Sequence, residues 1–220
     1  MSIMERLICL AIGYVCGLFQ TSYIIGRMHQ TDIREHGSGN AGTTNALRTF
    51  GKKAGALTLL GDCLKCIVAI LIVKALYRGS SADILPLLSL YAAAGCVLGH
   101  NFPFYLNFRG GKGVAASVGL VIAFDWRIFL ICFVVFFGLF FTTHYVSLCS
   151  ISAYLTALIC LIVFGELGHY GMDGPHTIEL YLVMAALTAL AVYRHRANIV
   201  RLFKGTENKI FLGKSGEKKA

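Results

Sequence analysis

The sequence predicts an all-α membrane protein, a bundle of seven transmembrane helices, and three observations support this fold class. Hydrophobic side chains make up 56% of the 220 residues and only 14% are charged, whereas about a quarter of the residues of a soluble domain are charged. The mean hydropathy is +0.69. Apolar segments of about 20 residues, the length that crosses a bilayer, follow one another along the chain. We therefore expect one integral-membrane domain over residues 1–220, with a basic tail at about 205–220.

Seven apolar segments are expected to form the spans, in the order 5–26, 54–77, 84–106, 113–124, 126–143, 145–165 and 178–193. The first lacks the basic start and the small-residue cleavage site of a signal peptide, so we expect it to be retained. Pro103 ends the regular helix of the third. The fourth is too short to cross a hydrocarbon core of about 30 Å without help. The eight cysteines lie almost entirely in these segments as small packing residues, although Cys63 and Cys66 form a lone CxxC, a spacing that metal sites also use.

The positive charges set the expected orientation, because short cytoplasmic loops gather Lys and Arg. These charges flank the loops after the first and third spans and follow the last span: Arg27, Arg34, Arg48, Lys52, Lys53, Arg109, Lys112, Arg194, Arg196, Arg201, Lys204, Lys209, Lys214, Lys218 and Lys219. The other side has only Arg6, Arg78 and Arg127. We therefore expect the N-terminus outside and the C-terminus in the cytoplasm. This topology accounts for most of the net charge of +9 and removes the main reason to expect a nucleic-acid partner.

The first expected cytoplasmic loop, EHGSGNAGTTNALR over residues 35–48, interleaves glycines with hydroxyl and amide side chains. Glycines let backbone N–H groups approach a ligand closely, so the loop suits a phosphate group. A flexible polar connector has a similar composition. The next span contains Asp62 and Lys65, three residues apart on one helix face. At membrane depth such a pair is either functional or a structural ion pair.

The second polar segment, GHNFPFYLNFRGGKGVA over residues 99–115, places Arg109 and Lys112 among three glycines before the short fourth span. The glycines are expected to expose backbone amides, and the helix start adds a positive end, so an anion would bind here. A glycine-relieved turn with a snorkelling lysine is the structural alternative. The segment is not a Walker A loop, because Leu106 stands where that motif has its first glycine.

The third polar segment, YRHRANIVRLFKGTENK over residues 193–209, begins where the last span meets the cytoplasm. If the helix continues, His195, Asn198 and Arg201 share adjoining faces until Gly205 ends it. An amphipathic helix on the lipid surface is the alternative. Ser147 and Ser150 provide two hydroxyl groups near the inner end of the sixth span. They are weak evidence for a site, because serines in membrane helices often hydrogen-bond to their own backbone.

In this order, GSGNAGTTNALR, GHNFPFYLNFRGGKGVA and RHRANIVRLFKGTENK resemble the three motifs of the bacterial acyl-phosphate:glycerol-3-phosphate acyltransferase family. The resemblance covers nearly the whole chain and departs from the usual motifs only at Thr43 and Ala116. It implies a seven-helix bundle in the bacterial inner membrane, with an active site that faces the cytoplasm. The implied reaction transfers a fatty acyl group from acyl phosphate to the 1-hydroxyl of sn-glycerol 3-phosphate, giving 1-acyl-sn-glycerol 3-phosphate (lysophosphatidic acid) and phosphate.

The resemblance also implies roles for individual residues. Glycerol 3-phosphate would be held by Arg48, Lys112, Ser150, His195 and Asn198. Acyl phosphate would be held by Ser38 with its neighbours and by the glycine turn, and Glu207 would order the third motif. The expected catalytic residues are Lys112, His195, Arg48 and Ser38. The expected substrate-binding residues are Gly37, Gly39, Asn40, Asn45, Arg109, Gly110, Gly111, Gly113, Ser150, Asn198 and Glu207.

The residue pattern favours direct attack of the glycerol hydroxyl on the acyl carbonyl, with a substrate phosphate oxygen or His195 accepting the proton. The sequence has neither a nucleophile elbow nor the HxxxxD pattern of thioester-dependent acyltransferases. No cluster of metal ligands appears, so we expect no metal or cofactor, and the enzyme is expected to act as a monomer in contact with membrane lipid. The main rival interpretation is a transporter of a phosphorylated anion, because broken helices whose ends point at anions also mark transport sites.

Overall fold

The computed structural model describes residues 3–211, and within this range the chain is helical without any strand. It has ten α-helices and three short 3-10 turns. Their bounds are α1 (Ile3–Gly17), α2 (Thr21–Met28), η1 (Ile33–Glu35), α3 (Thr43–Phe50), α4 (Lys52–Tyr77), η2 (Ala82–Ile84), α5 (Leu85–Asn101), η3 (Phe104–Leu106), α6 (Val114–Phe124), α7 (Trp126–Thr143), α8 (Val146–Glu166), α9 (Gly174–Arg194) and α10 (Arg196–Phe203). The expected all-α class is confirmed. Lys214, Lys218 and Lys219 of the expected basic tail lie outside the described residues.

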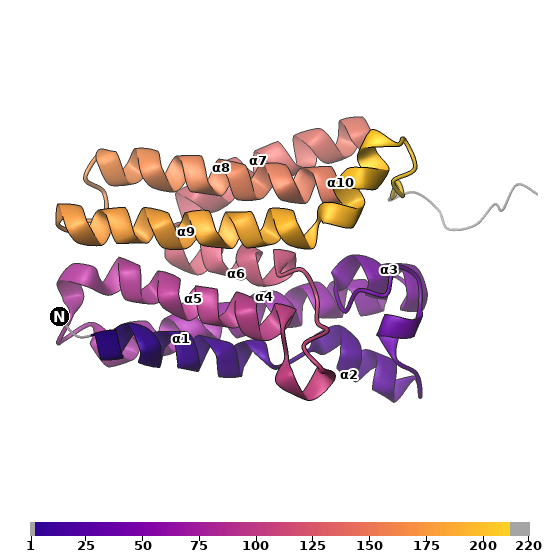
Figure 1. Cartoon of the computed structure of the whole chain (residues 1–220), viewed down its shortest axis with the longest axis horizontal. Helices are drawn as coiled ribbons and strands as arrows, with labels where there is room; N and C mark the ends of the chain where they lie inside the picture. Colours follow the sequence, from indigo (N-terminus) through magenta and orange to yellow (C-terminus); the bar gives the residue numbers. More distant parts are fainter. Residues whose placement is uncertain (1–2, 212–220) are drawn as a thin grey trace, which may run out of the picture.

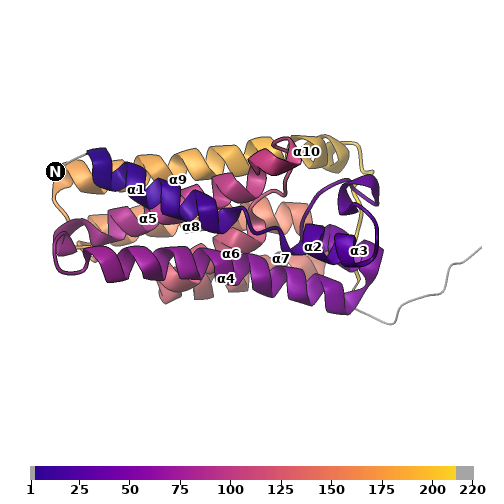
Figure 2. The ribbon, with the colours of Figure 1, turned by 90° about the horizontal axis from the view of Figure 1, so that it is seen from below.

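The long helices lie side by side along one axis of the molecule (Figures 1 and 2). α1 begins at the end marked N, whereas α2, α3 and α10 lie at the opposite end. Six helical segments are long and apolar enough to cross a membrane, namely residues 3–28, 52–77, 82–106, 126–143, 146–166 and 174–194. α6 is apolar but has only 11 residues, about 16 Å at 1.5 Å per residue. The fourth expected span is therefore as short as the sequence predicts.

The first span is broken between α1 and α2, which corrects the single helix expected over residues 5–26. Non-helical backbone at membrane depth must find partners inside the protein, and buried polar side chains provide them here. The Gln20 amide donates to the carbonyls of Gly17 at 3.2 Å and His100 at 3.1 Å. Lys65 Nζ donates to the Phe19 carbonyl at 2.7 Å. The break is therefore held by residues from α4 and α5.

α1 and α5 pack with their backbones in close contact, because each helix has a GxxxG pair at the crossing. Gly13 and Gly17 lie on α1, and Gly95 and Gly99 lie on α5. A Cβ atom on Gly13 would overlap the Ala92 carbonyl, and one on Gly95, Gly99 or Gly17 would overlap the backbone of the facing helix. Small residues let membrane helices approach in this way. The crossing fixes α5 at the centre of the bundle.

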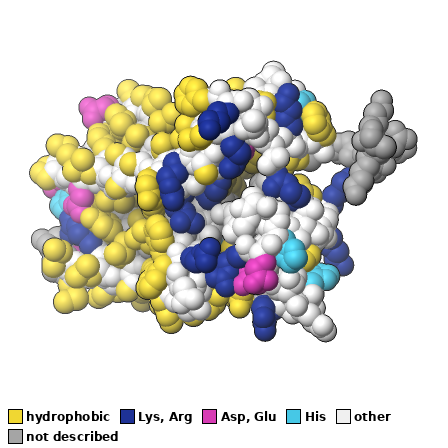
Figure 3. Space-filling model, turned by 45° about the vertical axis from the view of Figure 1, so that its right-hand side comes forward, with side chains coloured by type: hydrophobic (Ala, Val, Ile, Leu, Met, Phe, Trp, Pro, Cys, Tyr) yellow, Lys and Arg dark blue, Asp and Glu magenta, His cyan; other side chains and the backbone are white. Residues whose placement is uncertain are grey.

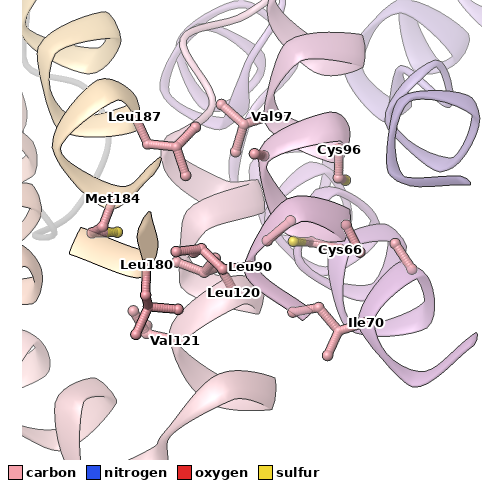
Figure 4. Packing of buried hydrophobic residues seen from close by; sticks show 14 of the residues in the cluster. Cys66, Ile70, Leu90, Cys96, Val97, Leu120, Val121, Leu180, Met184 and Leu187 are labelled. Atoms are coloured by element: carbon pink, nitrogen blue, oxygen red, sulfur yellow. The ribbon is translucent and has the colours of Figure 1, made fainter. Parts of the chain in front are cut away.

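The core lies between α4, α5, α6 and α9 (Figure 4). Its buried side chains include Ile70, Leu90, Leu120 and Met184, each no more than 3% exposed. Short α6 packs into this core against α4. Its last turn is held by Lys74 of α4, whose Nζ donates to the Ala123 carbonyl at 2.7 Å. Since a helix leaves its last carbonyls without helical partners, this lysine helps a short helix to end inside the bundle.

Candidate active site

The three polar segments predicted from the sequence meet at the end of the bundle opposite the N-terminus. Lys and Arg side chains gather at this end, whereas hydrophobic side chains cover the rest of the visible face (Figure 3). Residues of all three segments line one cavity of about 630 Å³. A second cavity of about 500 Å³ adjoins it and shares Ser38, Asn40, Lys112, Asn198 and Arg201 with it. Three segments that are far apart in the sequence therefore come together in the structure.

Asn45, which was expected to bind substrate, instead shapes the loop over residues 36–42. Its side chain is fully buried; Oδ1 accepts from the Ser38 N–H at 2.9 Å, and Nδ2 donates to the carbonyls of Ile33 and His36. Gly37 has a positive φ of 58° and packs against this amide. The Asn45 side chain is thus committed to the loop, so it positions the loop that lines the cavity. Ser38, Gly39 and Asn40 line the smaller cavity.

The turn over residues 107–113 is held against the end of α5, and this corrects the expected role of two of its glycines. The N–H groups of Gly110 and Gly111 donate to the carbonyls of Asn101 and His100, both at 3.1 Å. These two amides are therefore not free to bind an anion. Their importance is steric, because a Cβ on either glycine would overlap His100. Gly113 has a φ of 84°, which favours glycine, and opens α6.

Arg194, the last residue of α9, holds the same turn from the other side. Its guanidinium donates to the carbonyls of Gly110 at 3.1 Å and Gly111 at 2.6 Å and lies over the Phe102 ring. From the sequence alone, Arg194 is expected only to contribute to the charge bias that sets the topology. The one feature of the sequence that could have indicated its role in holding the turn is its position beside His195. A single sequence does not say, however, which side of the helix end a charge faces.

Lys112 stands where the two cavities join, and its Nζ donates to Asn198 Oδ1. Burial, opposed by the charge of Glu207 and reinforced by those of Arg201 and Arg194, lowers the pKa of Lys112 to about 8. The ammonium form therefore predominates at neutral pH, roughly nine molecules in ten. This is the one lysine within residues 3–211 that lines both cavities, and a half-buried cation there is suited to an anionic ligand.

Glu207 joins the third segment to α8 and α10. Its carboxylate accepts from Asn198 Nδ2 at 2.6 Å, Arg201 Nε at 2.7 Å and Ser147 Oγ at 3.0 Å. Burial alone would raise the pKa of Glu207, but these three hydrogen bonds outweigh it and lower the pKa. The ionised carboxylate orders the segment after Gly205, whose φ of 68° ends α10. Glu207 thus orients Asn198 toward Lys112.

His195 is buried in the short break between α9 and α10, so the helix expected to continue past it is interrupted at this residue. Its Nδ1 lies 2.8 Å from the Ala191 carbonyl, and because a carbonyl only accepts, Nδ1 carries the hydrogen. Burial, followed by the charge of Lys112, lowers the pKa of His195 to about 4. The ring is therefore neutral at pH 7 with Nε2 unprotonated. His195 lines the larger cavity and can accept a hydrogen bond there.

The other predicted residues lie at the cavity walls with fewer contacts. Arg48 in the last turn of α3 lines the larger cavity, and Arg109 lines the smaller one. Ser150 lines the larger cavity but donates to the Val146 carbonyl at 2.7 Å within its own helix. Gly37 and Gly39 border the smaller cavity. All the predicted residues except Gly111 line one of the two adjoining cavities, although not all offer a free polar group to it.

Asp62 and Lys65 form the structural ion pair that the sequence left open. Lys65 Nζ lies 2.9 Å from Asp62 Oδ1 and 2.8 Å from His100 Nδ1. Together with the hydrogen bond to the Phe19 carbonyl, these two contacts use all three N–H donors of the Lys65 ammonium group. The pair is buried, and His100 in turn packs against Gly111. The network ties the break in the first span to the glycine turn.

Away from its polar end, the larger cavity continues as an apolar groove between α4, α6, α7 and α8. A row of phenylalanines on α7 lines it, namely Phe129, Phe133, Phe136, Phe137 and Phe140. The sequence analysis assigned these side chains only to a span, because an aromatic stripe on a membrane helix has the same composition whether it faces lipid or a groove. The combination of a basic pocket and an apolar groove defines an integral-membrane protein whose site is suited to an anion beside a long hydrocarbon chain.

Comparison with known proteins gives the family. The glycerol-3-phosphate acyltransferase family matches residues 7–205. A glycerol-3-phosphate acyltransferase of Clostridioides difficile (strain 630) is 43% identical over 213 residues, 96% of this chain and 98% of that protein. One from Bacillus cytotoxicus is 42% identical over 202 residues, 91% of this chain and 92% of that protein. The chain belongs to the glycerol-3-phosphate acyltransferase family.

Two solved structures have the same fold, both of PlsY (YgiH), an integral membrane glycerol 3-phosphate acyltransferase. The glycerol 3-phosphate form superposes with a TM-score of 0.81 at 33% identity and covers 94% of this chain and 96% of that one. The lysophosphatidic acid form has a TM-score of 0.78 at 32% identity, with 94% and 95% covered. The resemblance inferred from the three motifs is confirmed, and the chain is an acyltransferase.

Proposed function

We propose that this chain transfers a fatty acyl group from acyl phosphate to the 1-hydroxyl of sn-glycerol 3-phosphate. The products are 1-acyl-sn-glycerol 3-phosphate and inorganic phosphate. The observation that carries the proposal is the position of Lys112, which lines both the polar cavity and the cavity that continues as the phenylalanine groove. One charge therefore adjoins both an aqueous pocket that fits a small phosphorylated polyol and a groove that fits an acyl chain.

Glycerol 3-phosphate enters the polar cavity, where Lys112, Arg109 and Arg201 supply positive charge. The neutral Nε2 of His195 accepts a hydrogen bond from one of its hydroxyl groups. The acyl chain lies in the groove, with its phosphate toward Ser38 and Lys112, while Arg48 on the wall of the same cavity faces glycerol 3-phosphate. Two anions repel each other, so bringing them together requires this excess of cations. Holding both substrates in a fixed orientation lowers the activation barrier by up to roughly 7–11 kcal/mol.

In the reaction, the 1-hydroxyl oxygen forms a bond to the acyl carbon, and the bond between that carbon and the phosphate oxygen breaks. Phosphate leaves with the bonding electrons. The hydroxyl proton passes to a substrate phosphate oxygen, because the second pKa of a phosphate ester is about 6 whereas the pKa of His195 is about 4. Since an acyl phosphate is already activated, no covalent acyl-enzyme is needed.

The rest of the proposal concerns the setting of the enzyme. A bacterial cell membrane holds it with seven crossings, the N-terminal end outside and the site facing the cytoplasm, and the basic end of the bundle supports this orientation. The enzyme acts as a monomer. The donor meets the groove from the surrounding lipid.

The proposal is tested with the purified chain in detergent and again in vesicles. With palmitoyl phosphate and glycerol 3-phosphate, we expect lysophosphatidate and inorganic phosphate in a one-to-one ratio. Palmitoyl-CoA and palmitoyl acyl carrier protein should give less than about a hundredth of that rate. Equal rates with a thioester would refute the donor. Uptake of glycerol 3-phosphate into vesicles without product would support the transporter interpretation instead.

A further inference from the structure

Two hydroxyl groups face each other inside the cavity, below the residues assigned so far. Ser117 of α6 and Tyr154 of α8 lie with their oxygens 2.6 Å apart. Both side chains line the larger cavity, and Tyr154 is only 5% exposed. Neither belongs to the three polar segments. Tyr154 is thus buried and Ser117 half-buried, and the pair lies at a cavity wall within a membrane bundle.

The pair lies at the boundary between the polar pocket and the apolar groove. On its polar side, a Cβ placed on Gly113 would be 3.4 Å from the Tyr154 hydroxyl, and Gly113 adjoins Lys112 in the chain. On its apolar side, the wall continues with Leu120, Val121 and Ala157. Ser117 and Tyr154 are thus the deepest oxygen-bearing side chains that α6 and α8 contribute to the cavity.

Counting donors shows that one hydrogen remains available. Each hydroxyl has one O–H, and the bond between the two oxygens uses one of them. Within residues 3–211, neither oxygen has a second hydrogen-bond acceptor in the protein. Whichever group donates to the other, one O–H is left at the cavity wall. A donor that lacks an acceptor in this apolar setting is unfavourable, so a ligand that accepts this hydrogen bond gains affinity or reactivity.

An acyl phosphate has one acceptor at the matching depth. Its phosphate lies at the polar end and its alkyl chain in the groove, so its carbonyl oxygen lies at the boundary between them. We propose that the Ser117–Tyr154 pair donates a hydrogen bond to this carbonyl oxygen and stabilises the negative charge that develops there during acyl transfer. This inference rests on the proposed function and makes Ser117 and Tyr154 further catalytic residues for it.

The step requires no other reactant. As the glycerol oxygen bonds to the acyl carbon, the carbonyl electrons move onto its oxygen, and the free O–H of the pair donates to that oxyanion without transferring its proton. The electrons return when the bond to phosphate breaks. The backbone amides of Gly110 and Gly111 cannot serve, because α5 carbonyls accept from them, so a donor must come from another part of the wall.

The test compares S117A, Y154F and the double variant with Y181F as the matched control. Tyr181 also joins α9 to α8 through its hydroxyl, at 3.3 Å from the Ile162 carbonyl and 3.0 Å from Glu166, but it lies at the opposite end and lines neither cavity. We expect the double variant to lose about 10²–10³-fold in kcat, the typical effect of removing an oxyanion donor. Each single variant should lose less, because the remaining hydroxyl can turn to the carbonyl, and Y181F should keep full kcat.

A second readout separates a carbonyl contact from phosphate binding or structural support. Hexadecyl phosphate has the phosphate and the chain but no carbonyl, so its inhibition constant should stay within about twofold of the wild-type value in every variant. If the double variant keeps its kcat, or if inhibition weakens in parallel with kcat, the inference is wrong. If the double variant does not fold, S117A alone decides by the same two measurements. An inactive wild-type chain would contradict the proposed function, not this contact.

Discussion

Lys112 shows how the surroundings of one residue determine its chemistry. Burial lowers its pKa to about 8, so its charge is present below pH 8 and is lost as the pH rises through that value. Binding of glycerol 3-phosphate needs the charged form. Glycerol 3-phosphate itself no longer titrates there, since the second pKa of a phosphate ester is about 6. We therefore expect kcat/KM for glycerol 3-phosphate to fall about tenfold per pH unit above pH 8.

The measurement is the pH profile of kcat/KM from pH 6.5 to 9.5, corrected for hydrolysis of the acyl phosphate. K112R is the matched control, because arginine stays charged over this range; its activity should be lower but should not decline above pH 8. K112A should lose nearly all turnover while the bundle melts at the wild-type temperature. A wild-type profile that stays flat, or an equal decline in K112R, would remove Lys112 from the phosphate site.

At the same scale, the sequence predicted which residues surround the site better than it predicted what each residue does. The motifs placed Lys112, Asn198 and Glu207 together, and the structure connects them through hydrogen bonds. The amides of Gly110 and Gly111 were expected to bind an anion, yet α5 carbonyls accept from them. Spacing along the chain identifies a glycine turn, but only the packing of α5 against it decides which N–H groups remain free.

The helices could be predicted to within a few residues because a span of membrane requires a long apolar segment. The break at residues 18–20 could not, since it lies in an apolar sequence without proline. It exists because Gln20 and Lys65 satisfy the backbone carbonyls that the break leaves without helical partners. Lys65 is distant in the chain, and the sequence does not show that the Gln20 side chain turns back to bond the backbone. α6 was predicted because its shortness is a property of the sequence itself.

The crossing of α1 and α5 gives the prediction at the scale of elements. A methyl group on Gly95 would overlap the backbone of Leu10 and Tyr14, so G95A must push the helices apart. We expect a loss of about 1–3 kcal/mol, the usual cost of overpacking, and a lower melting temperature. The matched control is G138A in α7, where nothing lies within 4 Å of the new methyl group. In a helix this change is neutral or stabilising by up to about 1 kcal/mol.

Thermal unfolding of both variants in the same detergent compares them directly, and activity at a temperature well below melting checks the site. Because α5 carries the turn that holds Lys112, G95A should also lower kcat/KM, while G138A should not change it. Equal melting temperatures for the two variants would mean that the α1–α5 contact is looser than the structure indicates.

For the whole molecule, charge and hydrophobicity divide along one axis. The cations gather at the end where α2, α3 and α10 lie (Figures 1 and 3), whereas Arg6 and Arg127 at the other end are paired with Glu179 and Asp125 at 2.6 Å and 2.7 Å. This distribution is the one expected if the basic end of the bundle, which holds the pocket, faces the cytoplasm.

The number of crossings depends on α6, whose 11 residues extend only about half of the hydrocarbon thickness of about 30 Å. If α6 crosses, Asp125 lies outside the cell; if it returns, Asp125 lies inside and the later helices invert.

We expect alkaline phosphatase fused after Asp125 or after Tyr170 to be active and green fluorescent protein at these positions to be dark. Fusions after Gly111 and after Thr206 should give the reverse result. The Gly111 fusion is the internal control, because it differs from the Asp125 fusion only by the short helix and its immediate flanks. Fluorescence after Asp125 together with phosphatase activity after Thr206 would exclude seven crossings and place the C-terminal end of the site outside.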